Sequence, residues 1–257
     1  MIDRPTPPRE LPPDPWTRLR QVTDARIGLT RSGASLATAP LLAFRAAHAE
    51  ARDAVHDVLE TAPLLDGLAA LGHSGMSVAS AAPDRHVYLL RPDLGRRLAD
   101  DVCLTPPPGG CDLALVIADG LSARAAQAHA VPLLARALPA LARDGWRIAP
   151  PVIVRQGRVA IGDAIAAALG AIAVAILIGE RPGLSSPDSL GAYLTWQPGP
   201  RTADADRNCL SNIRPAGISY EDAAFRLVYL LGQMRGRGLS GVRLKDDSDR
   251  LTLDAPR

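Results

Sequence analysis

The longest apolar run in the chain, from Ala164 to Gly179, places the strongest limit on the fold. It is shorter than the roughly 20 residues that an ordinary membrane-spanning helix needs. Gly170 divides it into an alanine-rich half, typical of a helix, and a β-branched half at 172–178. A fully apolar run rich in β-branched residues is typical of a strand that is buried on both faces of a parallel sheet. The run therefore predicts a helix followed by a central strand.

The chain after residue 84 continues this alternation of strand and helix. Strands are expected at 87–90, 112–118, 146–155, 172–178 and 193–197, and helices at about 123–143, 160–169 and 221–235. Such alternation predicts an α/β domain with a mostly parallel sheet, flanked by helices on both faces and joined by right-handed crossovers.

The residues before this domain follow a different pattern. Residues 1–15 hold six prolines and predict an extended arm. A short helix is expected over 16–29, a longer helix from Thr38 to about Glu60, and a glycine- and alanine-rich connection over 61–83. The expected organisation is an arm at 1–15, a small helical region at 16–83 and the α/β domain at 84–257.

Charge and cysteine content exclude several classes of protein. The formal net charge is only +2 and acidic residues alternate with arginines, so no basic block marks a nucleic-acid interface. The many arginines suit phosphate or carboxylate partners, or they reflect genome composition. The three cysteines show no CxxC spacing and no HExxH motif is present, which argues against a disulfide scaffold and a zinc site. A reducing compartment such as the cytoplasm is expected, because no signal peptide is recognisable either.

Three polar segments are expected at the carboxyl ends of the strands, where parallel sheets bind ligands. Segment 117–122 is a strand–turn–helix junction, in which Gly120 permits a tight turn and Ser122 can cap the helix. The free N–H groups at the start of this helix either bind an anion, or the junction is a capped strand–helix loop that binds no ligand. The segment lacks the dinucleotide GxGxxG and P-loop patterns, so NAD and ATP are poor candidates.

The other two segments, 178–187 and 206–213, carry further candidate residues. Glu180 ends a hydrophobic strand, where a carboxylate is costly unless Arg181 or a ligand binds it. Cys209 has no histidine nearby in sequence to activate it, so a buried and unreactive thiol is expected. No catalytic pair or triad is recognisable. This pattern favours a binding subunit or domain over a complete active site.

Seven motifs along the chain resemble the small (light) subunit of ethanolamine ammonia-lyase, over about residues 16–245. They are TDARI at 23–27, RSGASL at 31–36, RDAV at 52–55, YLLRPDLGRRL at 88–98, IADGLS at 117–122, LIGERPGL at 177–184 and RNCLSNI at 207–213. The last two motifs are the most specific. Several long motifs in the same order argue against chance agreement.

This resemblance implies a Rossmann-like, cobalamin-binding fold and a role as one subunit of a carbon–nitrogen lyase. Enzymes of this family convert ethanolamine to acetaldehyde and ammonia by radical chemistry, with adenosylcobalamin as the cofactor. A separate large subunit, a TIM-type barrel, carries the substrate pocket. The resemblance therefore implies that this chain is a non-catalytic, cofactor-binding subunit in a hetero-oligomer of several large–small pairs.

The family's cobalamin contacts correspond to Val159, Glu180 and Cys209 in this chain. The resemblance implies that Val159 packs on the corrin or its nucleotide tail, Glu180 accepts hydrogen bonds and Cys209 lines the pocket. Three neighbours are further candidates: Arg158, Arg207 and Asn208. The chain lacks the DxHxxG motif with which many B12 proteins supply a histidine ligand. The cofactor is therefore expected to keep its own dimethylbenzimidazole on cobalt, and this chain to supply no metal ligand.

Two alternatives remain open at this point. Some family members begin with an amphipathic helix that targets a bacterial microcompartment, whereas the proline-rich arm at 1–15 favours a free cytoplasmic enzyme. The chain also fits a stand-alone binding or regulatory domain for another nucleotide-like ligand. Tight binding without any partner chain would distinguish that domain from an enzyme subunit.

Overall fold

The computed structural model describes residue 14 and residues 16–248, which divide into two compact units between Ala49 and Glu50. The first unit holds α1 (Trp16–Arg20), β1 (Arg31–Ser32), β2 (Ser35–Leu36) and most of α2 (Thr38–His56), whose last residues belong to the second unit. Strands β1 and β2 pair in antiparallel fashion. Helix α1 is shorter than the helix predicted over 16–29. None of the described residues in the first unit is buried, so they form no hydrophobic core of their own.

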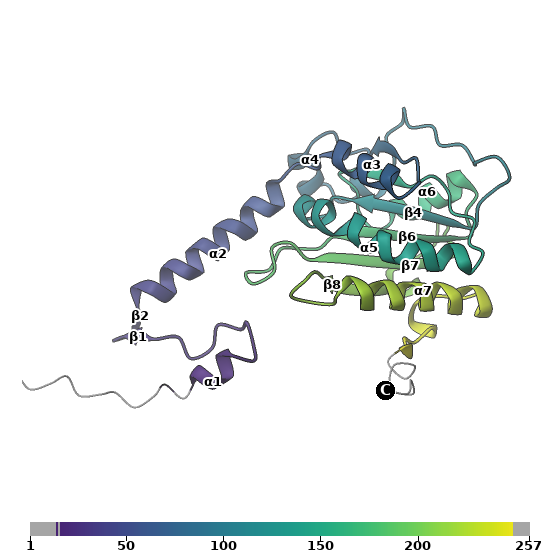
Figure 1. Cartoon of the computed structure of the whole chain (residues 1–257). Coiled ribbons are helices and arrows are strands. Elements are labelled where there is room, and N and C mark those ends of the chain that lie inside the picture. Colours follow the sequence, from purple (N-terminus) through teal and green to yellow (C-terminus); the bar gives the residue numbers. More distant parts are fainter. Residues whose placement is uncertain (1–13, 15, 249–257) are drawn as a thin grey trace, which may run out of the picture. The chain divides into compact units, whose positions relative to one another are not determined.

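The second unit is built around a six-stranded mixed sheet with the order β3–β5–β4–β6–β7–β8 (Figure 1). The strands are β3 (Met76–Ala79), β4 (Leu113–Ala118), β5 (Val152–Arg155), β6 (Ala173–Gly179), β7 (Leu190–Trp196) and β8 (Arg207–Ile213). Strands β3, β5, β4 and β6 are parallel, and β7 runs antiparallel to both β6 and β8. The predicted α/β fold with a mostly parallel sheet is confirmed.

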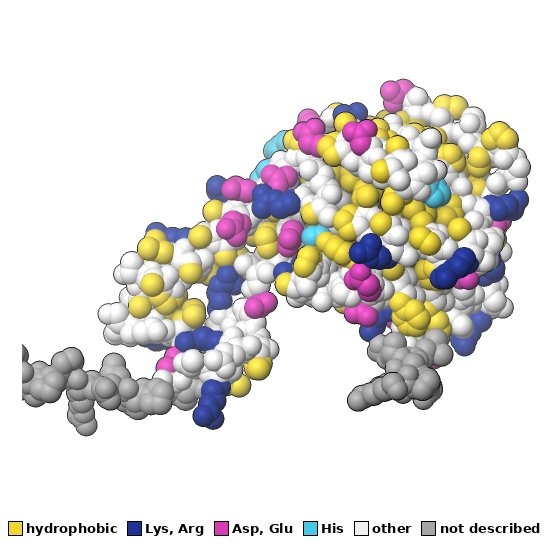
Figure 2. Space-filling view, in the orientation of Figure 1, with side chains coloured by type: hydrophobic (Ala, Val, Ile, Leu, Met, Phe, Trp, Pro, Cys, Tyr) yellow, Lys and Arg dark blue, Asp and Glu magenta, His cyan; other side chains and the backbone are white. Residues whose placement is uncertain are grey.

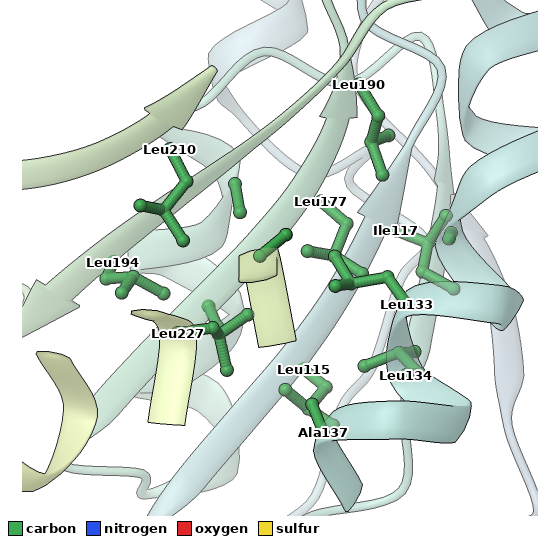
Figure 3. Packing of buried hydrophobic residues seen from close by; sticks show 14 of the residues in the cluster. Leu115, Ile117, Leu133, Leu134, Ala137, Leu177, Leu190, Leu194, Leu210 and Leu227 are labelled. Atoms are coloured by element: carbon green, nitrogen blue, oxygen red, sulfur yellow. The ribbon is translucent and has the colours of Figure 1, made fainter. Parts of the chain in front are cut away.

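Helices cover both faces of this sheet. They include α3 (Thr61–Ala70), α4 (Arg85–Leu90), α5 (Ala123–Arg143), α6 (Ile161–Leu169) and α7 (Tyr220–Arg237). Alternate residues of β4 pack on opposite sides: Leu115 belongs to the core with α5 and α7, and Val116 to the core with α6. Figure 3 shows the first core, in which Leu133 of α5 and Leu227 of α7 lie against the leucines of the sheet. Every residue of β4 and β6 is buried, which confirms the buried strand that the apolar run predicted at 172–178.

Three segments differ from the predicted elements. Residues 87–90 belong to helix α4 and not to a strand, because Asp84 caps this helix by accepting a hydrogen bond from Val87 N (2.8 Å). The expected connection over 61–83 contains α3 and the edge strand β3, so the sheet begins before residue 84. The polar segment 207–213 is the edge strand β8. An edge strand keeps part of its surface in water, which explains its polar sequence.

The surface and the cysteines agree with the composition of the chain. Charged side chains of both signs lie scattered over the face seen in Figure 2. Cys103, Cys111 and Cys209 are free thiols, and Cys111 is buried. Among the described helices, none has the length and apolar character needed to cross a membrane.

Candidate functional site

The carboxyl ends of β4, β5 and β6 surround a pocket of about 430 Å³, which we call the strand-end pocket. It is lined by Tyr88, Gly120, Leu121, Arg158, Val159, Ile178, Gly179, Glu180, Arg181 and Tyr193. This is the edge at which open parallel sheets bind ligands. Two of the three predicted cofactor contacts, Val159 and Glu180, thus lie in one pocket, and Cys209 is not among its lining residues.

The turn after β4 closes against β6 at the floor of this pocket. Gly120 has a left-handed φ of +55°, and a Cβ there would lie 2.2 Å from the carbonyl oxygen of Gly179. The N–H of Leu121 donates to that same oxygen (2.9 Å). Ser122 caps α5 by accepting from Ala125 N (3.3 Å), and its hydroxyl donates to the carbonyl of Pro187 (2.9 Å). The junction is therefore capped, and carbonyls of the chain accept from the N–H groups of Leu121 and Ser122. The N–H groups of Ala123 and Arg124 have no acceptor among the described residues.

Asp119 ties the turn after β4 to the loop after β5. Its side chain is almost fully buried, and its two oxygens accept hydrogen bonds from Gln156 N and Gly157 N, both at 2.9 Å. Arg85 Nη1 lies 3.6 Å from the same carboxylate. Burial raises the pKa of Asp119, and the backbone donors and Arg85 act in the opposite direction. Because Asp119 holds Gln156 and Gly157, it positions the residues that follow them, Arg158 and Val159.

Tyr88 and Arg158 form the wall of the pocket on the side of α4. The Arg158 guanidinium lies 4.2 Å from the centre of the Tyr88 ring, a cation–π distance, and its Nη2 donates to the Tyr88 carbonyl (3.2 Å). The Tyr88 hydroxyl donates to the carbonyl of Gly157 (3.1 Å). Burial raises the pKa of Tyr88, so the phenol stays protonated. Tyr88 was not predicted as a site residue, because the pattern of 87–90 suits a strand. Asp84, a helix-capping residue type three positions before Val87, is the signal that points to a helix.

Glu180 is half-buried at the end of β6 and is fixed from two sides. The hydroxyl of Ser189 and the N–H of Asn212 (3.1 Å) both donate to its Oε2. Its Oε1 lies next to Gly191, where an added Cβ would come within 2.9 Å. No described residue donates a hydrogen bond to Oε1, so this oxygen is available to a ligand. Arg181 does not form an ion pair with Glu180 in the described structure. Of the two partners considered for this carboxylate, Arg181 and a ligand, the ligand therefore remains.

Cys209 lies on β8, beside the pocket residue Tyr193 of β7. The expectation of a buried thiol is wrong: the residue is exposed, because it occupies an outward position of the edge strand. Loss of water around the sulfur still raises the pKa of Cys209, while a hydrogen bond with Tyr193 lowers it by less. The thiol is therefore mostly protonated at neutral pH and is a poor nucleophile.

Arg207, Asn208 and Arg158 have distinct roles in the structure. Arg207 is buried and forms a bidentate ion pair with Asp163 of α6, at 2.7 and 2.6 Å. Asn208 faces away from the pocket and bonds the backbone of Gly241 and Leu244. Of these three candidates, only Arg158 lines the strand-end pocket.

The described structure is thus an α/β domain with a mostly parallel sheet and a pocket at its strand ends. The sequence model of the family "Ethanolamine ammonia-lyase light chain (EutC)" matches residues 13–245. The chain therefore belongs to the ethanolamine ammonia-lyase small (light) subunit family, and its fold is the one expected for that family.

Curated relatives cover nearly the whole chain. The ethanolamine ammonia-lyase small subunit of Azotobacter vinelandii (strain DJ) is 54% identical, over 94% of this chain and 92% of that protein. The protein of the same description from Pseudomonas fluorescens (strain Pf-5) is 52% identical, over 94% of this chain and 90% of that protein. The one from Xanthomonas campestris pv. campestris (strain ATCC 33913) is 53% identical, over 96% of this chain and 92% of that protein. These names describe the smaller chain of a lyase with two kinds of subunit.

Proposed function

We propose that this chain binds adenosylcobalamin in the strand-end pocket and holds it against the large subunit of an ethanolamine ammonia-lyase. The observation that carries the proposal is the meeting of Val159 and Glu180 in one pocket. The resemblance assigned both residues to the cofactor, and the sheet topology independently predicts a ligand at this edge.

The residues of the pocket fit a corrinoid. Val159, Leu121 and Ile178 offer apolar contacts for the macrocycle. Glu180 Oε1 is an available acceptor for one of the amide groups around the corrin rim. A pocket of about 430 Å³ encloses only part of so large a molecule. The rest of the cofactor would lie outside this pocket, where a second protein surface can cover it, and this fits binding at the interface with the large subunit.

When bound, adenosylcobalamin supplies a radical by homolysis of its cobalt–carbon bond, and the protein supplies binding and orientation. In this chain, the described residues bind and shield the cofactor: Tyr88 and Arg158 form one wall, and Glu180 fixes an amide edge. The described residues that line the pocket include no histidine. The large subunit, a TIM-type barrel, would carry the substrate pocket in an assembly of several large–small pairs.

The location of the enzyme stays a prediction. We propose a free cytoplasmic enzyme, with a bacterial microcompartment as the alternative. Apart from residue 14, the proline-rich arm at 1–15 lies outside the described residues.

Co-expression with the large subunit tests the proposed function. Acetaldehyde release from ethanolamine is expected only when both chains and adenosylcobalamin are present, and the purified chain alone is expected to be inactive. Activity of the isolated chain would contradict the non-catalytic role. A well-folded complex without activity would favour another amino alcohol as the substrate, or the stand-alone domain for another nucleotide-like ligand.

A further inference from the structure

A second pocket of about 400 Å³ adjoins the strand-end pocket, and we call it the arginine pocket. It is lined by Pro92, Arg96, Arg158, Val159, Ala160, Thr202, Ala203, Asp204 and Arg207. Arg158 and Val159 line both pockets. The two pockets therefore meet at these residues, and one ligand can extend from the first into the second.

The three arginines of this pocket differ in how their charge is neutralised. Arg207 is paired with Asp163 through two short hydrogen bonds, and its Nε lies 3.7 Å from Asp204. Neither Arg96 nor Arg158 has a carboxylate within ion-pair distance in the described part of the chain. The pocket thus contains two arginine charges without a counter-charge, whereas its one lining carboxylate is already beside Arg207.

Arg158 is held in place for a ligand. Its backbone N–H donates to the Gly95 carbonyl (2.7 Å), and its guanidinium stacks over Tyr88. Its Nε is buried and has no hydrogen-bond acceptor among the described residues. A buried donor without an acceptor is costly unless a ligand or water satisfies it.

Further donors complete the pocket at the start of α6. The N–H groups of Ile161, Gly162 and Asp163 bond to carbonyls of the preceding turn. Those of Val159 and Ala160 have no acceptor among the described residues, and Ala160 at the N-cap position has no capping oxygen. The hydroxyl of Thr202 accepts from Gly199 N (2.8 Å), which leaves its own proton to donate. Guanidinium, amide and hydroxyl donors around one cavity are the set that binds a phosphate oxygen.

We propose that the arginine pocket binds the phosphodiester of the nucleotide tail of cobalamin, while the corrin edge occupies the strand-end pocket. This inference rests on the proposed function and deepens it. The tail joins the amide-bearing corrin, whose side chains carry no negative charge, to its base through one negatively charged phosphodiester. The two adjoining pockets differ in a related way. The strand-end pocket has the more apolar lining and contains the carboxylate of Glu180. The arginine pocket contains three arginines, one of which, Arg158, lines both pockets.

Comparing two corrinoids tests this assignment directly. Cobinamide carries the corrin without the nucleotide tail, so it lacks the phosphodiester. The reconstituted complex with the large subunit would be titrated with hydroxocobalamin and with aquocobinamide, and binding would be followed by the corrin absorption. Arg96→Gln is expected to weaken cobalamin binding about tenfold, as for the loss of one charge-assisted contact, and to leave cobinamide binding unchanged.

A matched control is provided by Arg97→Gln. Arg97 is the exposed neighbour of Arg96 and lines neither pocket, so this variant is expected to bind both corrinoids as the unchanged complex does. Arg158→Lys keeps the charge but loses the guanidinium fork, and it is expected to weaken cobalamin binding more than cobinamide binding. Equal losses for the two corrinoids, or no loss in Arg96→Gln, would overturn the assignment.

Competition with inorganic phosphate distinguishes two possible ligands of the arginine pocket, the nucleotide tail of cobalamin and a free anion. Phosphate is expected to compete with hydroxocobalamin and not with cobinamide. Simultaneous binding of phosphate and cobalamin would show that the pocket serves a free anion, and would overturn the assignment. If the unchanged complex binds neither corrinoid, the proposed function fails first; if it binds both and Arg96→Gln has no effect, only the phosphodiester assignment fails.

Discussion

The junctions after β4 and β5 lie at the same edge of the sheet but use their polar groups in opposite ways. After β4, the N–H groups of Leu121 and Ser122 bond to nearby carbonyls, and Ser122 caps α5. After β5, α6 begins without a side-chain cap, and the N–H groups of Val159 and Ala160 have no acceptor among the described residues. The first junction is closed in the sense that its turn is bonded and its helix is capped, although the N–H groups of Ala123 and Arg124 have no acceptor among the described residues. The second is open and leaves donors for a ligand.

Breaking the closed junction at Asp119 is expected to have the largest effect. Asp119→Ala removes the acceptor for two backbone N–H groups and leaves Arg85 without its buried partner. The free energy of unfolding should fall by about 3–5 kcal/mol, measured by urea denaturation. Glu221→Ala, which removes an exposed ion pair with Arg136, is the control and should cost less than about 1 kcal/mol. Similar losses in both variants would contradict the role given to Asp119.

The close approach of β4 and β6 can be tested with a pair of glycines. Gly120 and Gly145 both have positive φ, but only Gly120 lies against other atoms, and an added Cβ at Gly145 would meet nothing within 4 Å. Gly145→Ala should lower the free energy of unfolding by about 1 kcal/mol. Gly120→Ala should cost about 1–3 kcal/mol more because of the clash with Gly179, as thermal or urea unfolding would measure. Equal costs would mean that the turn relaxes freely.

Substitutions of Glu180 test whether the carboxyl edge of the sheet contacts the ligand. Glu180→Ala removes the available Oε1 acceptor and should weaken cobalamin binding to the reconstituted complex by about 1–3 kcal/mol. Glu180→Gln keeps one carbonyl acceptor and should lose less. The measurement is a titration followed by corrin absorption, and Glu221→Ala serves again as the exposed control. An unchanged affinity in Glu180→Ala would remove this residue from the site.

The smallest expected effect is the change in the alkylation rate of Cys209, which lies beside the pocket residue Tyr193. Because its pKa is raised, its alkylation rate should keep rising with pH beyond the range in which an ordinary exposed thiol has become thiolate. Cobalamin should slow the alkylation of Cys209 in the complex and leave the exposed Cys103 unaffected, as site-resolved mass spectrometry would show. Equal rates at Cys209 with and without cobalamin would place this residue outside the site.

The α/β fold could be predicted from the chain because its central strands carry an unambiguous signal. The apolar segment 172–178 predicts a strand buried on both faces, and β6 is buried along its whole length. Helix α4 could not be predicted in the same way, because the pattern of 87–90 suits a strand equally well and tertiary packing decides. Strand β8 was hidden for a related reason, since an edge strand carries polar residues that resemble a loop.

The candidate site was only partly predictable for a physical reason. Glycine and serine at 120 and 122 marked the closed junction, because capping and tight turns require particular residue types. The open junction carries no such mark, since Val159 and Ala160 offer backbone groups that any residue possesses. Its position followed only from the family resemblance. The ion pair between Asp163 and Arg207 neutralises one of the arginine charges of the arginine pocket. Its two residues are 44 positions apart in the sequence. No short sequence motif could therefore predict it.

Hydrogen exchange at the two junctions tests the central claim most directly. The complex with the large subunit would be compared with and without cobalamin, at the resolution of single amides. The N–H groups of Val159 and Ala160 should exchange more slowly with cobalamin, whereas those of Leu121 and Ser122, already bonded within the chain, should not change. No change at Val159 and Ala160 when cobalamin is bound, or slowing at the closed junction instead, would contradict the account.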